Sequence, residues 1–256
     1  MTALSPFFKY FGSKARSAKL YPEPRYETIE DSQCGGAGYP LNYPERNVIL
    51  CDIDTRVTII WKYLIHSSPE DIMRLPLMEP GQSIDTLDVC AEARLFISCC
   101  VNTSPFRKTL TEWKNGQNDG LWGAKWREKV ASQVDAIKHW KVINGSYADL
   151  PNIECTHFVD PLYQNLAQHY WAGREHPTDY RHLAQWCKSR KGQVIVCEQT
   201  GADWLPFRHL ATCAAVRNSG GKECEEAIWT NDGQAHEAEP VTMRKQLGLF
   251  ETEAAE

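Results

Sequence analysis

Three polar clusters follow apolar runs that have the length of buried strands, and their residue types suit a nucleoside and an unpaired base. The first is TIEDSQCGGAGY (28–39), in which acidic residues precede three glycines. The second is Asp52 in NVILCDID (47–54), and the third is the acid-proline-x-aromatic segment VDPLY (159–163). In an open α/β sheet, ligands bind at the carboxyl ends of the strands. These clusters therefore form the candidate site.

The first two clusters have the residue types of a nucleoside pocket. Glycines let the backbone approach a ligand closely at a tight turn, although the glycine cluster taken alone favours an ordinary turn. Asp52 ends the next strand, 14 residues after Gly38, where an acid suits the hydroxyl pair of a ribose. The alternative is that Asp52, or Asp54 beside it, caps the following helix. The order of glycine turn and acid favours the nucleoside interpretation.

The third cluster has the residue types that hold a flat ring bearing an amino group. The carboxylate of Asp160 and the carbonyl of Pro161 can each accept a hydrogen bond from that amino group, and Tyr163 offers a face for stacking. A strand followed by a β-turn explains the same residues, because Asp-Pro often starts turns. Glu198, at the end of a later strand-like run, either lines the pocket or has a local role.

Strands and helices that alternate along the chain must position these clusters. The runs 47–54, 155–160 and 192–199 are predicted as buried strands, and 55–65 and 179–190 as helices. This alternation indicates a parallel sheet covered on both faces, so the predicted fold class is α/β with a Rossmann-like sheet. Strand-like runs are absent between 66 and 150, which predicts a small, mainly helical insert.

Composition limits the function classes. The chain has 256 residues and a net charge of -5, so it is long enough for one α/β domain, and contacts with nucleic acid must be local. No apolar run is long enough for a membrane span and no signal peptide is evident, so we expect a cytoplasmic protein. The ten cysteines show no CxxC pair and no zinc spacing, so we expect reduced, buried cysteines and no metal.

Together and in this order, the clusters resemble the DNA adenine methyltransferases of the Dam-like group. PFFKYFGSK (6–14) resembles that family's N-terminal F-x-x-x-G-x-K element, VDPLY resembles its D-P-P-Y motif, and GQVIVCEQTGADWLPF and EEAIWTND resemble segments of its phage-borne members. The resemblance covers roughly residues 5 to 232. It implies S-adenosylmethionine as the methyl donor and the N6 of a flipped adenine in double-stranded DNA as the acceptor. It also implies a methyltransferase-type sheet; we expect a monomer or weak dimer.

The resemblance also implies site residues and domains. Carried over by position, it implies a cofactor pocket that contains Tyr10, Gly12, Lys14, Asp31, Gly35, Gly38, Asp52 and Asp160. It implies that the flipped adenine is held by Asp160, Pro161 and Tyr163. The catalytic, cofactor-binding domain would be discontinuous, at 1–65 and 146–235, with a target-recognition domain inserted at 66–145 and an acidic, flexible tail at 236–256.

The chain departs from the family at two points. Asp31-Ser32-Gln33 stands where Glu-Pro-Phe is usual, and Leu162 stands where the second proline of D-P-P-Y is usual. These departures leave open a slower enzyme, an enzyme with an altered donor or base, and a non-catalytic relative that binds DNA. An unrelated Rossmann-type enzyme is a further alternative.

Cations gather in the segment 107–141 although the whole chain is acidic. Eight cations and four anions give 8 − 4 = +4 there, with tryptophans interleaved. DNA requires phosphate contacts as well as base readout. We therefore predict DNA contacts at Arg107, Lys108, Lys114, Lys125 and Arg127. A solvated helix face with core tryptophans explains the same pattern.

Overall fold

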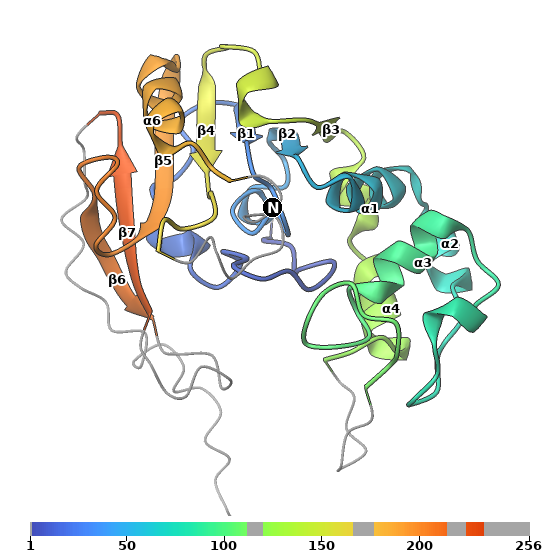
Figure 1. The fold of residues 1–256 in the computed structure, drawn as a ribbon. Coiled ribbons are helices and arrows are strands. Elements are labelled where there is room, and N and C mark those ends of the chain that lie inside the picture. Colours follow the sequence, from blue (N-terminus) through green and yellow to red (C-terminus); the bar gives the residue numbers. More distant parts are fainter. Residues whose placement is uncertain (1, 112–119, 166–176, 214–223, 233–256) are drawn as a thin grey trace, which may run out of the picture. The chain divides into compact units, whose positions relative to one another are not determined.

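The computed structural model describes residues 2–111, 120–165, 177–213 and 224–232, and the chain divides into two compact units. The first unit contains residues 1–19 and 26–151, and the second contains residues 20–25 and 152–256. Each unit contains both strands and helices (Figure 1). The protein is therefore an α/β protein, as predicted.

The first unit contains three parallel strands. They are β1 (Thr28–Asp31), β2 (Asn47–Asp52) and β3 (Lys141–Asn144), in the order β3-β2-β1. Asp31 pairs with Leu50, and Asp52 pairs with Asn144. This register places Asp31 and Asp52 at the carboxyl ends of neighbouring strands, as the strand-end argument required.

The helix after β2 begins as the sequence predicted. In α1 (Thr55–His66), the side chain of the N-cap residue Asp54 accepts a hydrogen bond from the backbone N–H of Arg56. Ile60, Trp61 and Leu64 are among its buried residues, so the apolar spacing of 55–65 marks the core face of the helix.

Between α1 and β3, the described residues form helices and one isolated β-bridge. The helices are α2 (Pro69–Arg74), α3 (Ala91–Ser98) and α4 (Ala124–Ala131), and the bridge joins Ser83 to Thr109. The expectation that strands are absent from 66 to 150 is wrong at β3. That strand has four residues, none of them buried, and therefore lacks the continuous apolar run of a central strand.

The second unit contains two parallel and two antiparallel strands. Its elements are β4 (Cys155–Val159), α6 (Tyr180–Ser189), β5 (Gly192–Gln199), β6 (Arg208–Cys213) and β7 (Cys224–Thr230). β4 and β5 are parallel, whereas β7 is antiparallel to both β5 and β6, in the order β4-β5-β7-β6. The helix α6 connects β4 to β5, which confirms the predicted strand–helix–strand unit.

Several short elements and the cysteines complete the description. Short 3-10 helices occupy Ala18–Leu20, Pro40–Asn42, Ile84–Thr86, Val134–Ile137 and Tyr147–Asp149. Eight of the cysteines are free, and of these only Cys90 is exposed, which agrees with the expected buried thiols. Within the described residues, none of the helices combines the length and the apolarity that a membrane span requires. Lys114 and the predicted tail at 236–256 lie outside the described residues.

Candidate functional site

The glycine turn after β1 packs closely against the N-terminal segment. A Cβ atom at Gly38 would lie 2.4 Å from the backbone nitrogen of Ala15, and one at Gly35 would lie 2.7 Å from the ring of Tyr10. The φ of Gly35 is +44°, a conformation that other residues rarely adopt. Chain packing by itself therefore requires glycines at these two positions, whether or not the turn binds a ligand.

The loop that carries Gly12 and Lys14 is fixed by its own hydrogen bonds. The buried ammonium group of Lys14 donates to the carbonyl of Gly12 over 2.9 Å. Gly12 has a φ of +74° with open space where a Cβ atom would be, so the backbone conformation is what requires glycine there. The F-x-x-x-G-x-K element thus forms an ordered loop within the same unit as the glycine turn.

The carboxylate of Asp52 closes the glycine turn. Its Oδ2 accepts the backbone N–H of Gly35 and its Oδ1 accepts that of Asp54, each over 2.9 Å. Burial raises the pKa of Asp52 to about 6, although these two hydrogen bonds act in the opposite direction. The thiol of Cys34 also donates to Oδ2, over 3.9 Å. A carboxylate has about four lone-pair sites, so Asp52 has a structural role and keeps about one site, on Oδ1, for a further donor.

Two residues that we did not predict, Arg56 and Phe106, lie beside Tyr10. The guanidinium of Arg56 pairs with the carboxylate of Asp54 over 2.7 Å and lies 4.0 Å from the centroid of the Phe106 ring. The rings of Phe106 and Tyr10 meet edge to face at 6.5 Å. Burial, and then the charges of Asp52 and Asp54, raise the pKa of Tyr10. Tyr10 is therefore a neutral group next to two carboxylates.

Phe106 also carries backbone strain. Its φ is +56°, which is unusual for a bulky residue and is often retained at binding sites. Phe106 lies in an irregular stretch with no periodic pattern, so no local signal pointed to it. Arg56 follows the predicted helix cap by two residues, and an Asp-x-Arg pair at a helix start was a signal for the ion pair.

The segment Asp31-Ser32-Gln33, which follows the start of β1, forms a local hydrogen bond. Asp31 and Ser32 are buried, and the hydroxyl of Ser32 donates to the side-chain oxygen of Gln33 over 2.6 Å. Gln33 thus takes part in a hydrogen bond with its neighbour in the chain.

In the second unit, the residues after β4 form a turn that several elements hold. The hydroxyl of Tyr163 donates to Glu226 over 2.5 Å, and the carbonyl of Leu162 accepts the hydroxyl of Tyr180 over 2.7 Å. Asp160 is half-buried and Pro161 is buried. Burial, and then the charge of Asp160, raise the pKa of Tyr163 well above its usual value, so its hydroxyl remains a donor.

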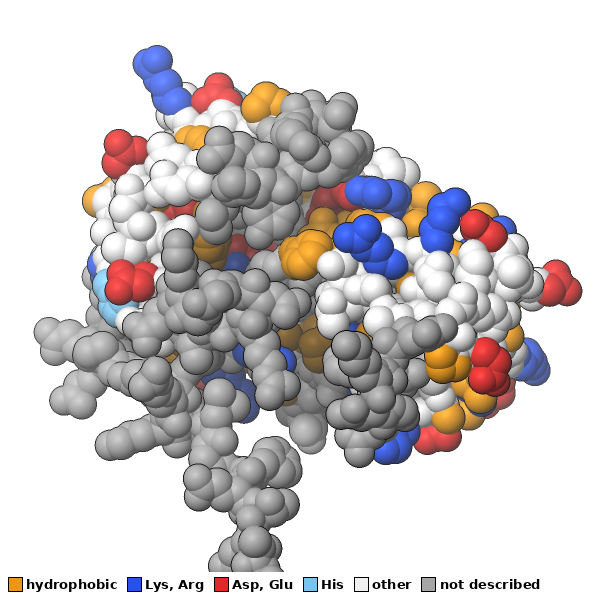
Figure 2. All heavy atoms as spheres, turned by 60° about the horizontal axis from the view of Figure 1, so that its bottom comes forward, with side chains coloured by type: hydrophobic (Ala, Val, Ile, Leu, Met, Phe, Trp, Pro, Cys, Tyr) orange, Lys and Arg blue, Asp and Glu red, His pale blue; other side chains and the backbone are white. Residues whose placement is uncertain are grey.

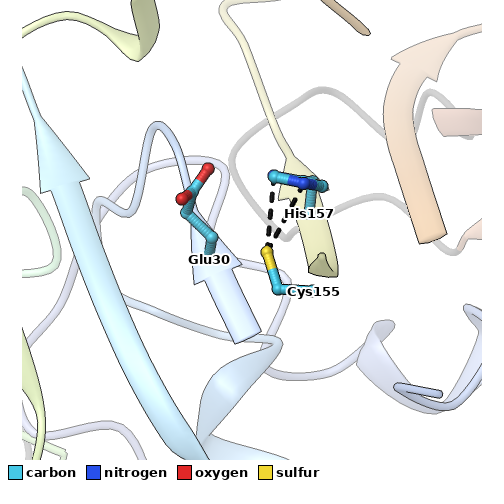
Figure 3. A group of neighbouring side chains, drawn as sticks. All are labelled: Glu30, Cys155 and His157. Carbon is cyan, nitrogen blue, oxygen red and sulfur yellow. Dashed lines mark hydrogen bonds between the residues drawn. The ribbon is translucent and has the colours of Figure 1, made fainter. Parts of the chain in front are cut away.

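A buried cysteine and histidine lie on one face of β4 (Figure 3). The Sγ of Cys155 is 3.4 Å from Nε2 and 3.7 Å from Nδ1 of His157. That Nε2 donates to the carbonyl of Lys191 over 3.0 Å, and the ring meets Trp186 edge to face. His157 is therefore a core histidine whose Nε2 has a backbone partner.

Glu30, on β1 of the first unit, is also fully buried.

The four described cations among the predicted DNA contacts have different environments. Arg107, Lys108 and Lys125 are exposed, and Lys108 pairs with Asp85 over 3.2 Å. Arg127 is half-buried, and its guanidinium donates to a backbone carbonyl over 2.7 Å. Figure 2 shows one face of the molecule, on which cations are interspersed with acidic and hydrophobic side chains. Arg127 therefore has a structural contact, whereas the exposed cations are accessible.

Two described tryptophans of this segment, Trp122 and Trp126, donate hydrogen bonds to the backbone. The indole N–H of Trp122 donates to the carbonyl of Pro76 over 2.9 Å, and that of Trp126 donates to Phe7 over 3.1 Å. Trp122 is 1% exposed, so it is a core residue, in agreement with the alternative interpretation for that position.

Comparisons with known proteins do not identify a family. No protein-family model matches the chain, and no curated protein matches its sequence. A solved structure described as a conserved hypothetical protein from Streptococcus pyogenes is similar over 82% of this chain and 88% of that chain. The sequence identity is 9% and the TM-score is 0.35, and a similarity at this level supports no argument about function.

Proposed function

We propose that the protein is a DNA methyltransferase that transfers a methyl group from S-adenosylmethionine to the N6 of a flipped adenine. The observation that carries the proposal is the ordered turn after β4. There Asp160 and Pro161 follow a buried strand directly, and hydrogen bonds hold the next residues, Leu162 and Tyr163. An acid, a backbone carbonyl and an aromatic ring in this order suit an adenine edge and face.

The first unit supports the donor half of the proposal. Asp52 ends β2 with about one acceptor site left for a ribose hydroxyl, and it lies close to the glycine turn and Tyr10. In this proposal Arg56 and Phe106 border the nucleoside site, because they contact Asp54 and Tyr10. The pocket is completed by Gly12, Lys14, Asp31, Gly35 and Gly38, as the resemblance implies.

The proposed reaction needs no metal and no covalent enzyme intermediate. The amino nitrogen of adenine is a poor nucleophile, because its lone pair is delocalised into the ring. The Asp160 carboxylate and the Pro161 carbonyl would accept hydrogen bonds from its two N–H groups and stabilise the positive charge that develops on nitrogen as the N–C bond forms and the S–C bond of the sulfonium breaks. S-adenosylhomocysteine would leave as the thioether, and the excess proton on N6 would be lost to solvent. The bound sulfonium supplies an already activated methyl group, so alignment of donor and acceptor contributes much of the rest. Tyr163 would add stacking worth about 1–3 kcal/mol per base.

Double-stranded DNA is the proposed partner, with phosphate contacts from the exposed cations of 107–125. A protein that acts on bacterial or phage DNA would work in the cytoplasm, and we propose that location. The charge of the whole chain is -5, so binding would depend on this local set and would weaken with salt.

The variant Asp160→Ala tests the proposal. We expect it to abolish methyl transfer to DNA while S-adenosylmethionine still binds, because the carboxylate acts on the acceptor base. The matched variant Asp160→Asn keeps the shape and one acceptor oxygen, so its rate should fall without a change in folding. Methyl incorporation and calorimetric titration of the donor measure the two properties. Full activity of Asp160→Ala would exclude the proposed role.

A further inference from the structure

We infer that Glu226, Glu198 and Tyr180 are positioning residues that hold the turn after β4 in the geometry of methyl transfer; this inference rests on the proposed function. None of the three belongs to the motif that suggested the reaction. They lie on three elements, β7, β5 and α6, and each contacts one of three consecutive residues of the chain.

Glu226 holds the side chain of Tyr163, the tyrosine of the turn, at its hydroxyl group. Its Oε2 accepts the hydroxyl of Tyr163 over 2.5 Å and that of Tyr21 over 3.0 Å. The side chain is on β7 and is 8% exposed. Because a buried carboxylate is costly unless donors surround it, this arrangement fixes both phenols as donors. The ring of Tyr21 in turn meets Phe158 on β4 edge to face at 5.5 Å.

Glu198 anchors the backbone one residue further on. Both of its oxygens lie within 3.2 Å of the backbone nitrogen of Gln164. The same carboxylate accepts the N–H of Gln199 over 2.9 Å and the indole N–H of Trp204 over 2.8 Å. Glu198 is fully buried, so a set of charge-assisted hydrogen bonds replaces its hydration.

The two carboxylates hold the turn from opposite faces of the sheet. In the antiparallel register of β5 and β7, Glu226 is opposite Gln199, so these two side chains share a face. Glu198 precedes Gln199 and therefore points to the other face. The turn after β4 is thus held on both sides of the sheet, which restricts its tilt more than either contact alone.

Tyr180 provides the third contact, at the residue that departs from the family. Its hydroxyl donates to the carbonyl of Leu162 over 2.7 Å. A proline at this position would fix φ through its ring, which leucine lacks. The hydrogen bond from α6 instead fixes the orientation of the peptide group that follows. The turn therefore has external restraints on Leu162, Tyr163 and Gln164 in succession.

Such restraints matter for catalysis, because a misplacement of about 1 Å can lower a rate about a hundredfold. Tyr163→Phe removes only the hydroxyl that Glu226 holds, and Glu226→Gln keeps the shape but removes the charge. We expect each variant to lower kcat for DNA methylation about tenfold to a hundredfold, with S-adenosylmethionine affinity unchanged. Because both substitutions disrupt the same contact, the one between Tyr163 and Glu226, the kcat of the double variant should be little lower than that of the slower single variant.

A control variant separates positioning from stability. The hydroxyl of Thr156 on β4 donates to Gln193 over 2.9 Å in the core, away from the turn. Thr156→Val should lower the melting temperature while kcat is kept. Unchanged kcat in Tyr163→Phe and Glu226→Gln, or an equal loss in Thr156→Val, would overturn the positioning role. A wild-type protein that transfers no methyl group would refute the proposed function, and the positioning role with it.

Discussion

Replacing Asp52 with asparagine tests the electrostatics of the proposed nucleoside site without any substrate. The carboxylate is 8% exposed and accepts the backbone N–H groups of Gly35 and Asp54. Burial is the largest cause of the rise in its pKa from 3.8 to about 6. Ionisation of Asp52 therefore opposes folding, in contrast to that of a salt-bridged carboxylate.

The sign and size of the effect follow from these values. Because the pKa is higher in the folded protein, the contribution of Asp52 to stability is fully present below about pH 3.8, the unfolded value, and is lost as the pH rises to about 6. The folded and unfolded pKa values differ by about 2, and a difference of one in pKa corresponds to 1.36 kcal/mol, so the change in the free energy of unfolding is about 3 kcal/mol. Asparagine does not titrate. The free energy of unfolding of Asp52→Asn relative to the wild type should therefore rise by up to about 3 kcal/mol between about pH 4 and pH 7.

Urea denaturation of both proteins at a series of pH values measures this difference. Asparagine has only one acceptor oxygen for two backbone donors, which carries a cost of about 1–3 kcal/mol that does not depend on pH. That cost cancels when the difference is compared across pH, provided that the m-values agree. A difference that stays constant from acid to neutral pH would show that Asp52 is not held in a desolvated, ionised state.

Three further predictions concern ligand binding and packing. If Asp52 accepts ribose hydroxyls, the affinity of the wild type for S-adenosylmethionine should be constant above about pH 6 and weaken below it, by at most about tenfold per pH unit. Equilibrium dialysis at several pH values measures this affinity, and an affinity that does not change with pH would contradict the prediction. Gly38→Ala places a Cβ atom 2.4 Å from the backbone nitrogen of Ala15 and should destabilise the protein by about 1–3 kcal/mol or more in a thermal melting assay. Gly120→Ala is the matched control in that assay, because a Cβ atom at Gly120 meets nothing closer than 3.8 Å. Lys125→Glu should weaken DNA binding and flatten its salt dependence without loss of protein stability. Arg127→Glu should in addition destabilise the protein, because it loses a hydrogen bond to a backbone carbonyl. Equal stabilities of the two variants and an unchanged salt slope would argue against this assignment.

The strands that were predictable are those with continuous apolar runs. β2, β4 and β5 are buried along most of their length, so their sequences alone indicate central parallel strands. β3 was not recognised, because its four residues are at most half-buried. β7 was not recognised either, since it begins with a cysteine and two acids. Glu226 in β7 is buried because two distant tyrosines donate to it, which is a tertiary effect that no local pattern contains.

The site was predictable only where a strand ends. Asp52 and Asp160 follow strand runs directly, so the strand-end argument identifies both as candidates. Arg56 and Phe106 come together from positions 50 residues apart, and Glu226 is 63 residues from Tyr163. Such contacts depend on how the elements pack, and no local sequence pattern reveals that packing.

The transfer of a labelled methyl group from S-adenosylmethionine to unmethylated double-stranded DNA tests the central claim most directly. Nucleoside mass spectrometry of the digested product identifies the modified base. We predict N6-methyladenine with the wild-type protein and none with Asp160→Ala. Donor binding without any methylated adenine, or methylation of another base, would contradict the claim that the turn after β4 holds a flipped adenine.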